Sequence, residues 1–183
     1  MKLVRCVFAL LVFMTGGAHA VLMDFEEYRT PYELNCFGYV VEDAGFQIQF
    51  TPPPEELHPV GMCAATPLWR FHYGTAVGMF ANNCRAVSTL SAVGGRRFAL
   101  QSMDLQELNG DAPVSVTFFG LHSEGRTVTF TVNLNGTPEW ERIEFPAEFK
   151  NVRQVSWQQG SEDCWVNRPH MFANIRVNVL GRD

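Results

Sequence analysis

The chain has 183 residues, of which 18% are charged, and a formal net charge of −5. This acidic balance excludes a nucleic-acid partner held by phosphate contacts, because such binding requires clustered basic residues. After residue 20 no basic cluster exceeds the pair Arg96-Arg97, so a polybasic membrane-binding patch is excluded as well.

Residues 1–20 have the three parts of a secretory signal peptide. Two basic residues stand near the start, residues 7–14 are an unbroken apolar run, and small residues close the segment at Ala18-His19-Ala20. The apolar run is too short to span a bilayer. We therefore predict cleavage after Ala20, a secreted or periplasmic location and no membrane insertion. Residues 21–183 then form one domain with 12 basic and 19 acidic residues and a net charge of −7.

Residues 21–28 predict a first strand at the domain edge. Residues 38–50 predict a second strand region, in which Phe46, Ile48 and Phe50 face one way. Three prolines at positions 52–54 end it, because proline removes donors from the ladder. From residue 55 to residue 81 the sequence loses its period, which predicts a long irregular excursion. Loops of this length inside compact domains are more often functional than average.

Period 2 returns at residues 85–105, with a bulge predicted near Gln101-Ser102 where the alternation changes phase. The clearest pattern covers residues 112–136: two arms, apolar on one face and largely threonine on the other, meet at a turn containing Gly125. Such a hairpin needs a second sheet over its apolar face. Short strands follow at 141–145 and 153–157, with a turn or a single helical turn predicted between them at 146–152. The last strand, 171–179, is predicted to alternate throughout, with Met171, Ala173, Ile175, Val177 and Val179 on one face. The chain therefore predicts an all-β, antiparallel two-sheet β-sandwich.

Four cysteines remain after the leader is removed. An even number in an exported chain predicts two disulfides. Sequence leaves three pairings open. We favour Cys63 with Cys84, which closes a local excursion, and Cys36 with Cys164, which ties an early loop to the loop before the last strand. No Cys-x-x-Cys pair is present, so a zinc site is not predicted.

Six short segments, taken in order, resemble a known family. They are DFE at 24–26, FALQSMDL at 98–105, VSVTFFG at 114–120, TVTFTV at 127–132, FPAEFKNVRQVSW at 145–157 and MFANIRV at 171–177. This order resembles the jelly-roll β-sandwich domain of exported bacterial proteins, the type associated with PEP-CTERM tails, which is similar to carbohydrate-binding modules. No PEP-CTERM tail follows Val179. The resemblance implies a jelly roll and non-catalytic binding of a polysaccharide or an envelope glycan.

The resemblance also implies a position for a structural calcium ion. Jelly rolls of this kind hold Ca²⁺ between a carboxylate after the first strand and a carboxylate in the last strand, since the ion takes six to eight oxygen ligands. Glu26 matches the first position, but Ala173 stands where the second carboxylate belongs. Asp24, Glu26 and Asn174 are the ligands we predict. The alternative is that these carboxylates are solvated at a strand end. No other cofactor is predicted.

No motif predicts catalysis: a nucleophile elbow, a zinc-protease motif and a phosphate-binding glycine loop are all missing from the sequence. Sugar recognition needs flat aromatic faces with amides beside them. The residues predicted to supply these are Trp69, Tyr73, Asn82, Asn83 and Trp165. The alternative is that the rings fill a satellite core beneath the loops. Competing functions are a structural or adhesive envelope protein and, third, a glycan-active enzyme with paired carboxylates.

Overall fold

The computed structural model describes residues 19–55, 61–69, 74–81, 83, 85–108, 114–137, 139–160 and 170–180. Over these ranges the chain forms β-strands and two short 3-10 helices. The strands are β1 (His19–Met23), β2 (Leu34–Phe37), β3 (Val40–Asp43), β4 (Phe46–Thr51), β5 (Met62–Ala65), β6 (Gly78–Ala81), β7 (Val87–Ala92), β8 (Phe98–Glu107), β9 (Ser115–His122), β10 (Thr127–Asn133), β11 (Glu141–Glu144), β12 (Val152–Gln158) and β13 (His170–Val179). The 3-10 helices are η1 (Glu26–Tyr28) and η2 (Ala147–Asn151).

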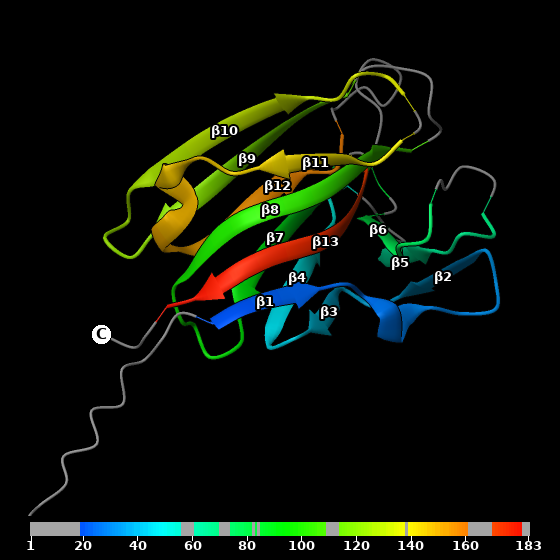
Figure 1. Ribbon diagram of the computed structural model, residues 1–183, viewed down its shortest axis with the longest axis horizontal. Coiled ribbons are helices and arrows are strands. Elements are labelled where there is room, and N and C mark those ends of the chain that lie inside the picture. Colours follow the sequence, from blue (N-terminus) through cyan, green and yellow to red (C-terminus); the bar gives the residue numbers. More distant parts are fainter. Residues whose placement is uncertain are drawn as a thin grey trace, which may run out of the picture.

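The strands form two antiparallel sheets, which we name the front sheet and the back sheet after their places in Figure 1. The front sheet has the order β1-β13-β8-β11, and β6, β5 and β2 continue it from β13. The back sheet has the order β3-β4-β7-β12-β9-β10. In the described part of the chain one residue pair, Phe98 with Val152, links the ladders of β8 and β12.

The connections between the two sheets define the topology. From β7 the chain crosses to β8 in the front sheet, returns to β9 and β10, crosses to β11, returns to β12 and ends in β13. Two four-stranded sheets, β1-β13-β8-β11 and β7-β12-β9-β10, connected in this way form a jelly roll. The predicted fold class, an all-β antiparallel sandwich of jelly-roll type, is confirmed.

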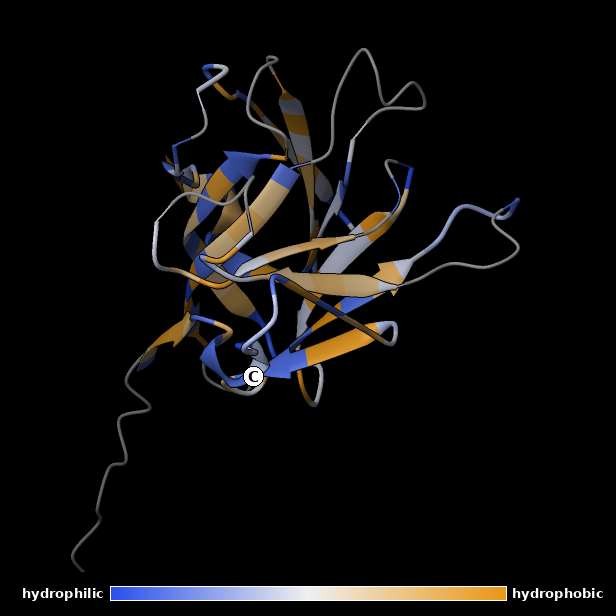
Figure 2. Cartoon of the chain, turned by 90° about the vertical axis from the view of Figure 1, so that its right-hand side faces the viewer, coloured by the Kyte–Doolittle hydropathy of each residue, from blue (hydrophilic) through white to orange (hydrophobic). Residues whose placement is uncertain are grey.

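The core lies between the facing sheets and is built from alternate residues of each strand. Along β9, Val116 and Phe118 are buried and Thr117 is turned outward. The same alternation gives the strands their bands of hydrophobic and hydrophilic colour in Figure 2. Trp157 is fully buried, with its ring centroid 5.7 Å from Phe118 of the same sheet and 5.1 Å from Phe172 of the facing sheet. Each buried large apolar side chain contributes about 1.5–3 kcal/mol to stability.

Two bulges set which residues of the front sheet face the core. The register of β8 shifts between Ser102 and Leu100, which confirms the bulge predicted near Gln101. A second bulge in β13 lies at Asn174, whose φ is 48°. Because of it Phe172 and Ile175 share the inner face, so the prediction that β13 keeps one uninterrupted alternation is wrong.

The predicted irregular excursion contains a hairpin. β5 and β6 pair antiparallel over four residue pairs, and all eight of their residues are buried. Neither strand alternates in hydrophobicity, because both of their faces are covered. The excursion is therefore partly a buried extension of the front sheet.

The structure contradicts the predicted disulfide pairing. Cys36 of β2 and Cys63 of β5 lie opposite each other in an antiparallel ladder and form a disulfide. Neither is then available for the predicted partners Cys84 and Cys164, both of which lie outside the described residues. The pairing of β2 with β5 brings the two sulfur atoms together, and sequence separation does not reveal that register.

The first strand crosses the predicted cleavage site. β1 pairs with β13 from His19 opposite Val179 to Met23 opposite Ile175. Cleavage after Ala20 would leave Val21, Leu22 and Met23 of this strand, with three of its five pairs. The ranges that the structure describes contain no helix with the length and hydrophobicity needed to cross a membrane.

Candidate functional site

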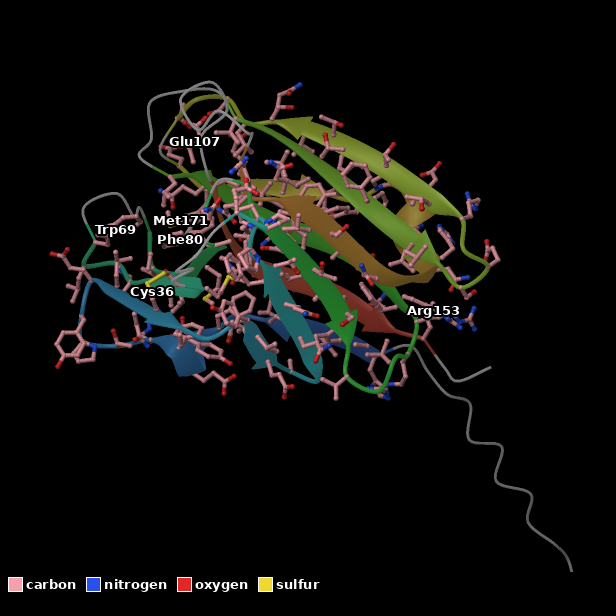
Figure 3. All side chains as sticks on the ribbon, turned by 180° about the vertical axis from the view of Figure 1, so that it is seen from behind. Cys36, Trp69, Phe80, Glu107, Arg153 and Met171 are labelled. Carbon is pink, nitrogen blue, oxygen red and sulfur yellow. A yellow bond between two sulfur atoms is a disulfide. The ribbon has the colours of Figure 1, made fainter. Side chains whose placement is uncertain are left out.

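Trp69 lies in a small apolar cluster on the outer side of the front sheet. Its ring is half-buried and stacks on Phe80, with centroids 5.7 Å apart and planes 6° from parallel. The buried members of this cluster are Cys63, Ala65, Phe80, Leu108 and Met171, and the rings of Trp69 and Trp140 pack against them. Figure 3 shows Trp69, Phe80 and Met171 together at one end of the molecule.

Trp140 was missed by the sequence analysis. A Cβ added to Gly74 would lie 3.3 Å from its indole ring, so the loop at Gly74 packs directly on it. One signal in the sequence could have identified Trp140. If the predicted strand at 141–145 is extended by one residue, Trp140 and Arg142 are two positions apart and lie on the same face of the strand. The cluster therefore matches the alternative reading, in which large rings fill a satellite core.

Substituting Trp69 should lower stability. We expect Trp69→Ala to reduce the free energy of unfolding by about 2 kcal/mol, less than the 3–5 kcal/mol of a fully buried ring, because half of this ring is already exposed. Leu68→Ala is the matched control: Leu68 is 63% exposed and its loss should cost less than about 0.5 kcal/mol. Chemical denaturation followed by fluorescence measures both. Equal stability of the two variants would contradict a packing role for Trp69.

The other predicted sugar-binding residues are not brought to Trp69 by any described contact. The side-chain oxygen of Asn83 accepts a hydrogen bond of 2.9 Å from the backbone N–H of Arg85, and its backbone oxygen accepts one from Ala86. Asn83 therefore shapes the turn that leads into β7. Tyr73, Asn82 and Trp165 lie outside the described residues, and their role remains a prediction.

The predicted calcium ligands make hydrogen bonds within the protein. Glu26 accepts two hydrogen bonds of 2.6 Å from Arg29, and this guanidinium holds the pKa of Glu26 below its usual value. The amide nitrogen of Asn174 donates to Asp104 at 2.8 Å. The Asp24 carboxylate accepts from the backbone N–H of Glu26. Across the described ranges no group of three or more His, Cys, Asp or Glu side chains is arranged to hold a metal ion. The calcium site at Asp24, Glu26 and Asn174 therefore stays a prediction.

A different surface has the chemistry of a binding site. It is the outer face of four neighbouring strands of the back sheet, β4, β7, β12 and β9, and we call it the polar face. Its side chains are Gln47, Gln49, Thr51, Val87, Thr89, Ser91, Gln154, Ser156, Gln158, Thr117, Phe119 and Leu121. Figure 3 views the molecule from this side, with Arg153 at the far end of β12 from the loops.

Backbone register arranges these side chains in straight rows across the strands. One row runs through the pairs Gln49–Thr89, Thr89–Ser156 and Ser156–Phe119. A second row runs through Gln47–Ser91, Ser91–Gln154 and Gln154–Leu121. Neighbouring strands are about 4.8 Å apart, so each row places hydrogen-bonding groups at short regular intervals along a line.

None of these twelve side chains is charged, and the one exposed charged residue within the four strands, Arg153, lies at the register shift near the start of β12. About a quarter of the residues in a soluble domain are charged, and these lie mostly at the surface, so about three charges would be expected here. Strand propensity accounts for the threonines, but it does not favour glutamine. Strand propensity therefore does not explain why four glutamines stand on this face.

Most of these amides are available to a ligand. Gln47 donates to the hydroxyl of Ser91 at 3.2 Å. By contrast, the structure gives Gln49, Gln154 and Gln158 no side-chain hydrogen bond to any residue in the described ranges. Each amide offers two donors and one acceptor oxygen. An uncharged surface of this kind matches a ligand that carries many hydroxyl groups.

Phe119 supplies an aromatic surface on the same face. Its side chain is 44% exposed although it lies in the middle of β9, between Ser156 of β12 and Thr129 of β10. Leu121 follows it on the same strand and is 36% exposed. A ring in this position presents an edge or a face to solvent with hydroxyl groups on both sides.

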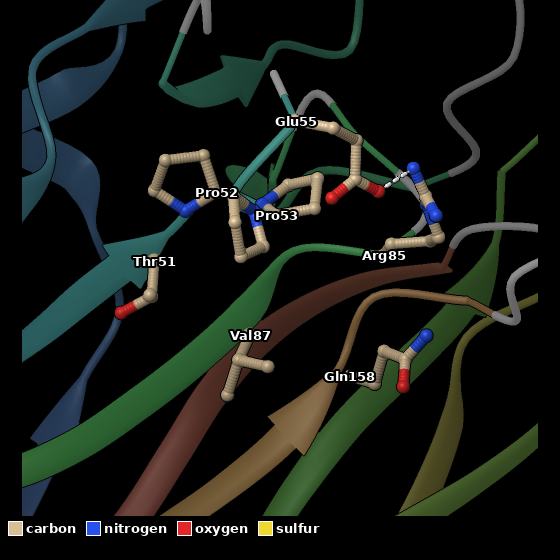
Figure 4. A pocket seen from close by; sticks show the side chains of 8 residues that line it. Thr51, Pro52, Pro53, Glu55, Arg85, Val87 and Gln158 are labelled. Atoms are coloured by element: carbon tan, nitrogen blue, oxygen red, sulfur yellow. Dashed lines mark ion pairs between the residues drawn. The ribbon is translucent and has the colours of Figure 1, made fainter.

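One end of the polar face opens into a hollow of about 400 Å³. Thr51, Val87 and Gln158 belong to both the face and the hollow, whose other walls are Pro52, Pro53, Pro54, Glu55 and Arg85 (Figure 4). Glu55 and Arg85 form an ion pair at the rim. The volume falls within the range of small-molecule sites, about 300–1,000 Å³. The polar face and the hollow together form the candidate site.

Comparison with known proteins gives no family assignment. No protein-family model and no curated protein matches the chain. Several solved structures are similar at low sequence identity, and three of them are carbohydrate-binding modules. The first is the CBM22-1-CBM22-2 tandem domain of Xyn10C from Paenibacillus barcinonensis, with 12% identity and a TM-score of 0.43. That match covers 90% of this chain, which spans only 47% of the tandem.

The second is a mutant of CBM29-2, a family 29 carbohydrate-binding module, with 11% identity, a TM-score of 0.40 and coverage of 88% of this chain and 91% of that one. The third is the family 11 carbohydrate-binding module from Clostridium thermocellum, in complex with a β-1,3-1,4-mixed-linked tetrasaccharide. It has 9% identity, a TM-score of 0.36 and coverage of 90% and 97%. All three TM-scores are low, and the function proposed below therefore rests on the chain's own residues.

Proposed function

We propose that this protein is a non-catalytic binding domain for a neutral polysaccharide, which lies along the polar face and reaches into the hollow. The observation that carries the proposal is the combination, on one sheet surface, of an exposed phenylalanine ring, rows of side chains without charge, and three glutamine amides that have no side-chain hydrogen bond in the described ranges. Sugar hydroxyls need partners that both donate and accept, and amides and hydroxyls do both. The apolar side of a sugar ring matches Phe119.

The same features argue against the other candidate functions. A glycosidase needs two carboxyl groups about 5–10 Å apart. Among the described residues that line the hollow, Glu55 is the only carboxylate, and Arg85 is bonded to it. The other alternative, a structural or adhesive envelope protein without a ligand, gives no reason for uncharged glutamines on the polar face. The Cys36–Cys63 disulfide is typical of proteins in oxidising compartments outside the cytosol.

Removing the Phe119 ring should weaken binding. We expect Phe119→Ala to lower the affinity for a neutral polysaccharide about tenfold, which corresponds to about 1.4 kcal/mol. We expect a smaller loss for Gln158→Ala, which removes one amide at the mouth of the hollow. Affinity electrophoresis in gels that contain soluble glucan or xylan measures the effect, with alginate as an anionic comparison. Binding to alginate but not to glucan or xylan would contradict the proposal of a neutral ligand.

Leu34→Ala is the matched control for Phe119→Ala. Leu34 lies on β2, away from the back sheet, and its side chain is 37% exposed. Both variants remove a partly exposed apolar side chain from a strand, so their melting temperatures should change by similar small amounts. If both variants lose affinity equally, the polar face is not the binding site.

A further inference from the structure

β10 is an edge strand whose outer side has no partner among the described strands. It pairs with β9 alone, and Figure 1 shows it at the outer margin of the sandwich. The backbone bonds from Leu134 to Val114 and from His122 to Arg126 show that the even-numbered residues bond toward β9. The N–H and C=O groups of Thr127, Thr129, Thr131 and Asn133 therefore point away from the sheet.

The usual protections of an edge strand are missing from β10. Native proteins protect edges with lysine, proline, bulges or very short strands. β10 is seven residues long, reads TVTFTVN, and pairs with β9 without a register shift. It carries no charge, so two copies can approach without like-charge repulsion although the chain as a whole is acidic.

The sequence of β10 is nearly symmetric about Phe130. Reading outward from this residue in both directions gives threonine, then valine, and then Thr127 on one side and Asn133 on the other. A second copy of β10 laid antiparallel and centred on Phe130 would therefore match like with like. Thr129 would face Thr131 of the second copy, and Val128 would face Val132 of the second copy.

The hydrogen-bonding pattern fits the same register. In this pairing the hydrogen-bonded pairs between the two copies are formed by odd-numbered residues. These are the residues whose backbone N–H and C=O groups point away from β9 and toward the second copy. Four such pairs give about eight backbone hydrogen bonds. The outer face would carry threonine pairs, and cross-strand threonine pairs are favourable. The inner face would bring Val128, Phe130 and Val132, all half-buried and packed on the core, against the same residues of the second copy.

We propose that two copies of this chain associate through β10, antiparallel and about a two-fold axis at Phe130. The two back sheets then form one continuous sheet of twelve strands. The interface is isologous, since each copy contributes the same surface, so it closes at two copies and does not propagate. The proposal does not depend on the polysaccharide site, because β10 lies beside the polar face and not within it.

Two double variants test both the interface and its register. In Thr129→Lys/Thr131→Lys, each new lysine would face a lysine of the second copy, and we expect a monomer. In Thr129→Lys/Thr131→Glu, each lysine would face a glutamate of the second copy, and we expect the dimer to persist. Both variants change the same two exposed positions and lose the same Thr117–Thr131 hydrogen bond, so the cost to the fold is matched. Sedimentation velocity of the protein without residues 1–20 measures the state.

Three outcomes would overturn the proposal: a monomeric unsubstituted protein, dimers of both variants, or monomers of both variants. Val40→Lys, on the opposite edge strand β3, should leave the dimer intact, and loss of the dimer there would place the interface elsewhere. A mixture of Thr129→Cys and Thr131→Cys proteins should cross-link more than either alone, because hydrogen-bonded pairs have Cα atoms about 5.5 Å apart, within disulfide range. Stronger cross-linking of either protein alone would contradict this register.

Discussion

The contribution of His170 to the free energy of unfolding should fall by about 1.4 kcal/mol for each unit that the pH drops between roughly 6 and 4, because this residue is buried without charge. Its side chain is fully buried in β13, and neither ring nitrogen has a hydrogen-bond partner in the described ranges. Burial lowers the pKa of His170 to about 3. The backbone of Gln159 acts in the opposite direction and raises this pKa, but by less than burial lowers it.

The direction follows from which state binds the proton. In the unfolded chain the pKa of the ring is about 6.5, so between this value and about 3 the unfolded chain takes up a proton that the folded chain refuses. The stabilisation from the neutral ring is therefore fully present above pH 6.5 and is lost progressively as the pH falls.

His170→Leu should remove this contribution, because leucine is apolar and does not titrate. Urea denaturation of both proteins at several pH values measures the difference between them, which cancels the titration of carboxylates common to both. Ile175→Val is the control: it lowers stability by about 1 kcal/mol at every pH. Glu107 is also buried and lies opposite His170 in register, so the comparison is repeated with Glu107→Gln in both proteins. The same pH slope with and without His170 would contradict this account.

Removing the Cys36–Cys63 disulfide should lower the free energy of unfolding by about 3–4 kcal/mol. The bond joins residues 27 apart in sequence. A disulfide that closes a loop of this size lowers the entropy of the unfolded chain, and this destabilisation of the unfolded state is worth about that much free energy. We expect the effect in Cys36→Ala/Cys63→Ala, measured by guanidinium denaturation without reductant. β2 is mostly exposed and pairs with β5 alone in the described part of the chain, so its own packing offers little compensation.

Measurement with reductant provides the control, since the two proteins should then converge in stability. A difference of less than about 1 kcal/mol without reductant would show that the bond does not constrain the unfolded chain. The same samples report on Cys84 and Cys164. Since Cys36 and Cys63 bond to each other, the prediction of two disulfides now requires Cys84 and Cys164 to pair. The unreduced, denatured protein without residues 1–20 should have no free thiol, and two free thiols would contradict that pairing.

Alternation predicted those strands that have one face in the core and one in water. β9 and β10 follow the predicted hairpin, β4 ends at Thr51 where the prolines begin, and η2 lies where a single helical turn was predicted. In each case the local pattern and the tertiary environment agree. The bulge at Gln101 could be predicted although both faces of β8 are covered, because the large apolar residues change phase there, from Phe98 and Leu100 to Met103 and Leu105.

Alternation failed where both faces of a strand are covered. β5 and β6 have no polar side to reveal their period, and Met171 and Ala173 of β13 are buried although they lie outside the main core. The predicted binding residues were chosen as large rings in loops, which serve packing as well as recognition. The polar face was missed because its glutamines, serines and threonines come from separate strands, and only the register shows that they form rows.

The pairing of β1 with β13 has a consequence for how the chain folds. β13 holds the middle of the front sheet, between β1 and β8, yet it comes last in sequence among the described strands. The sandwich cannot close until residues 170–179 arrive, and contacts of such long sequence range slow folding to the millisecond-to-second regime. A chain that emerges from the ribosome in order therefore stays open until residues 170–179 have been made. This delay favours export, because the predicted leader would direct the chain across a membrane before it folds.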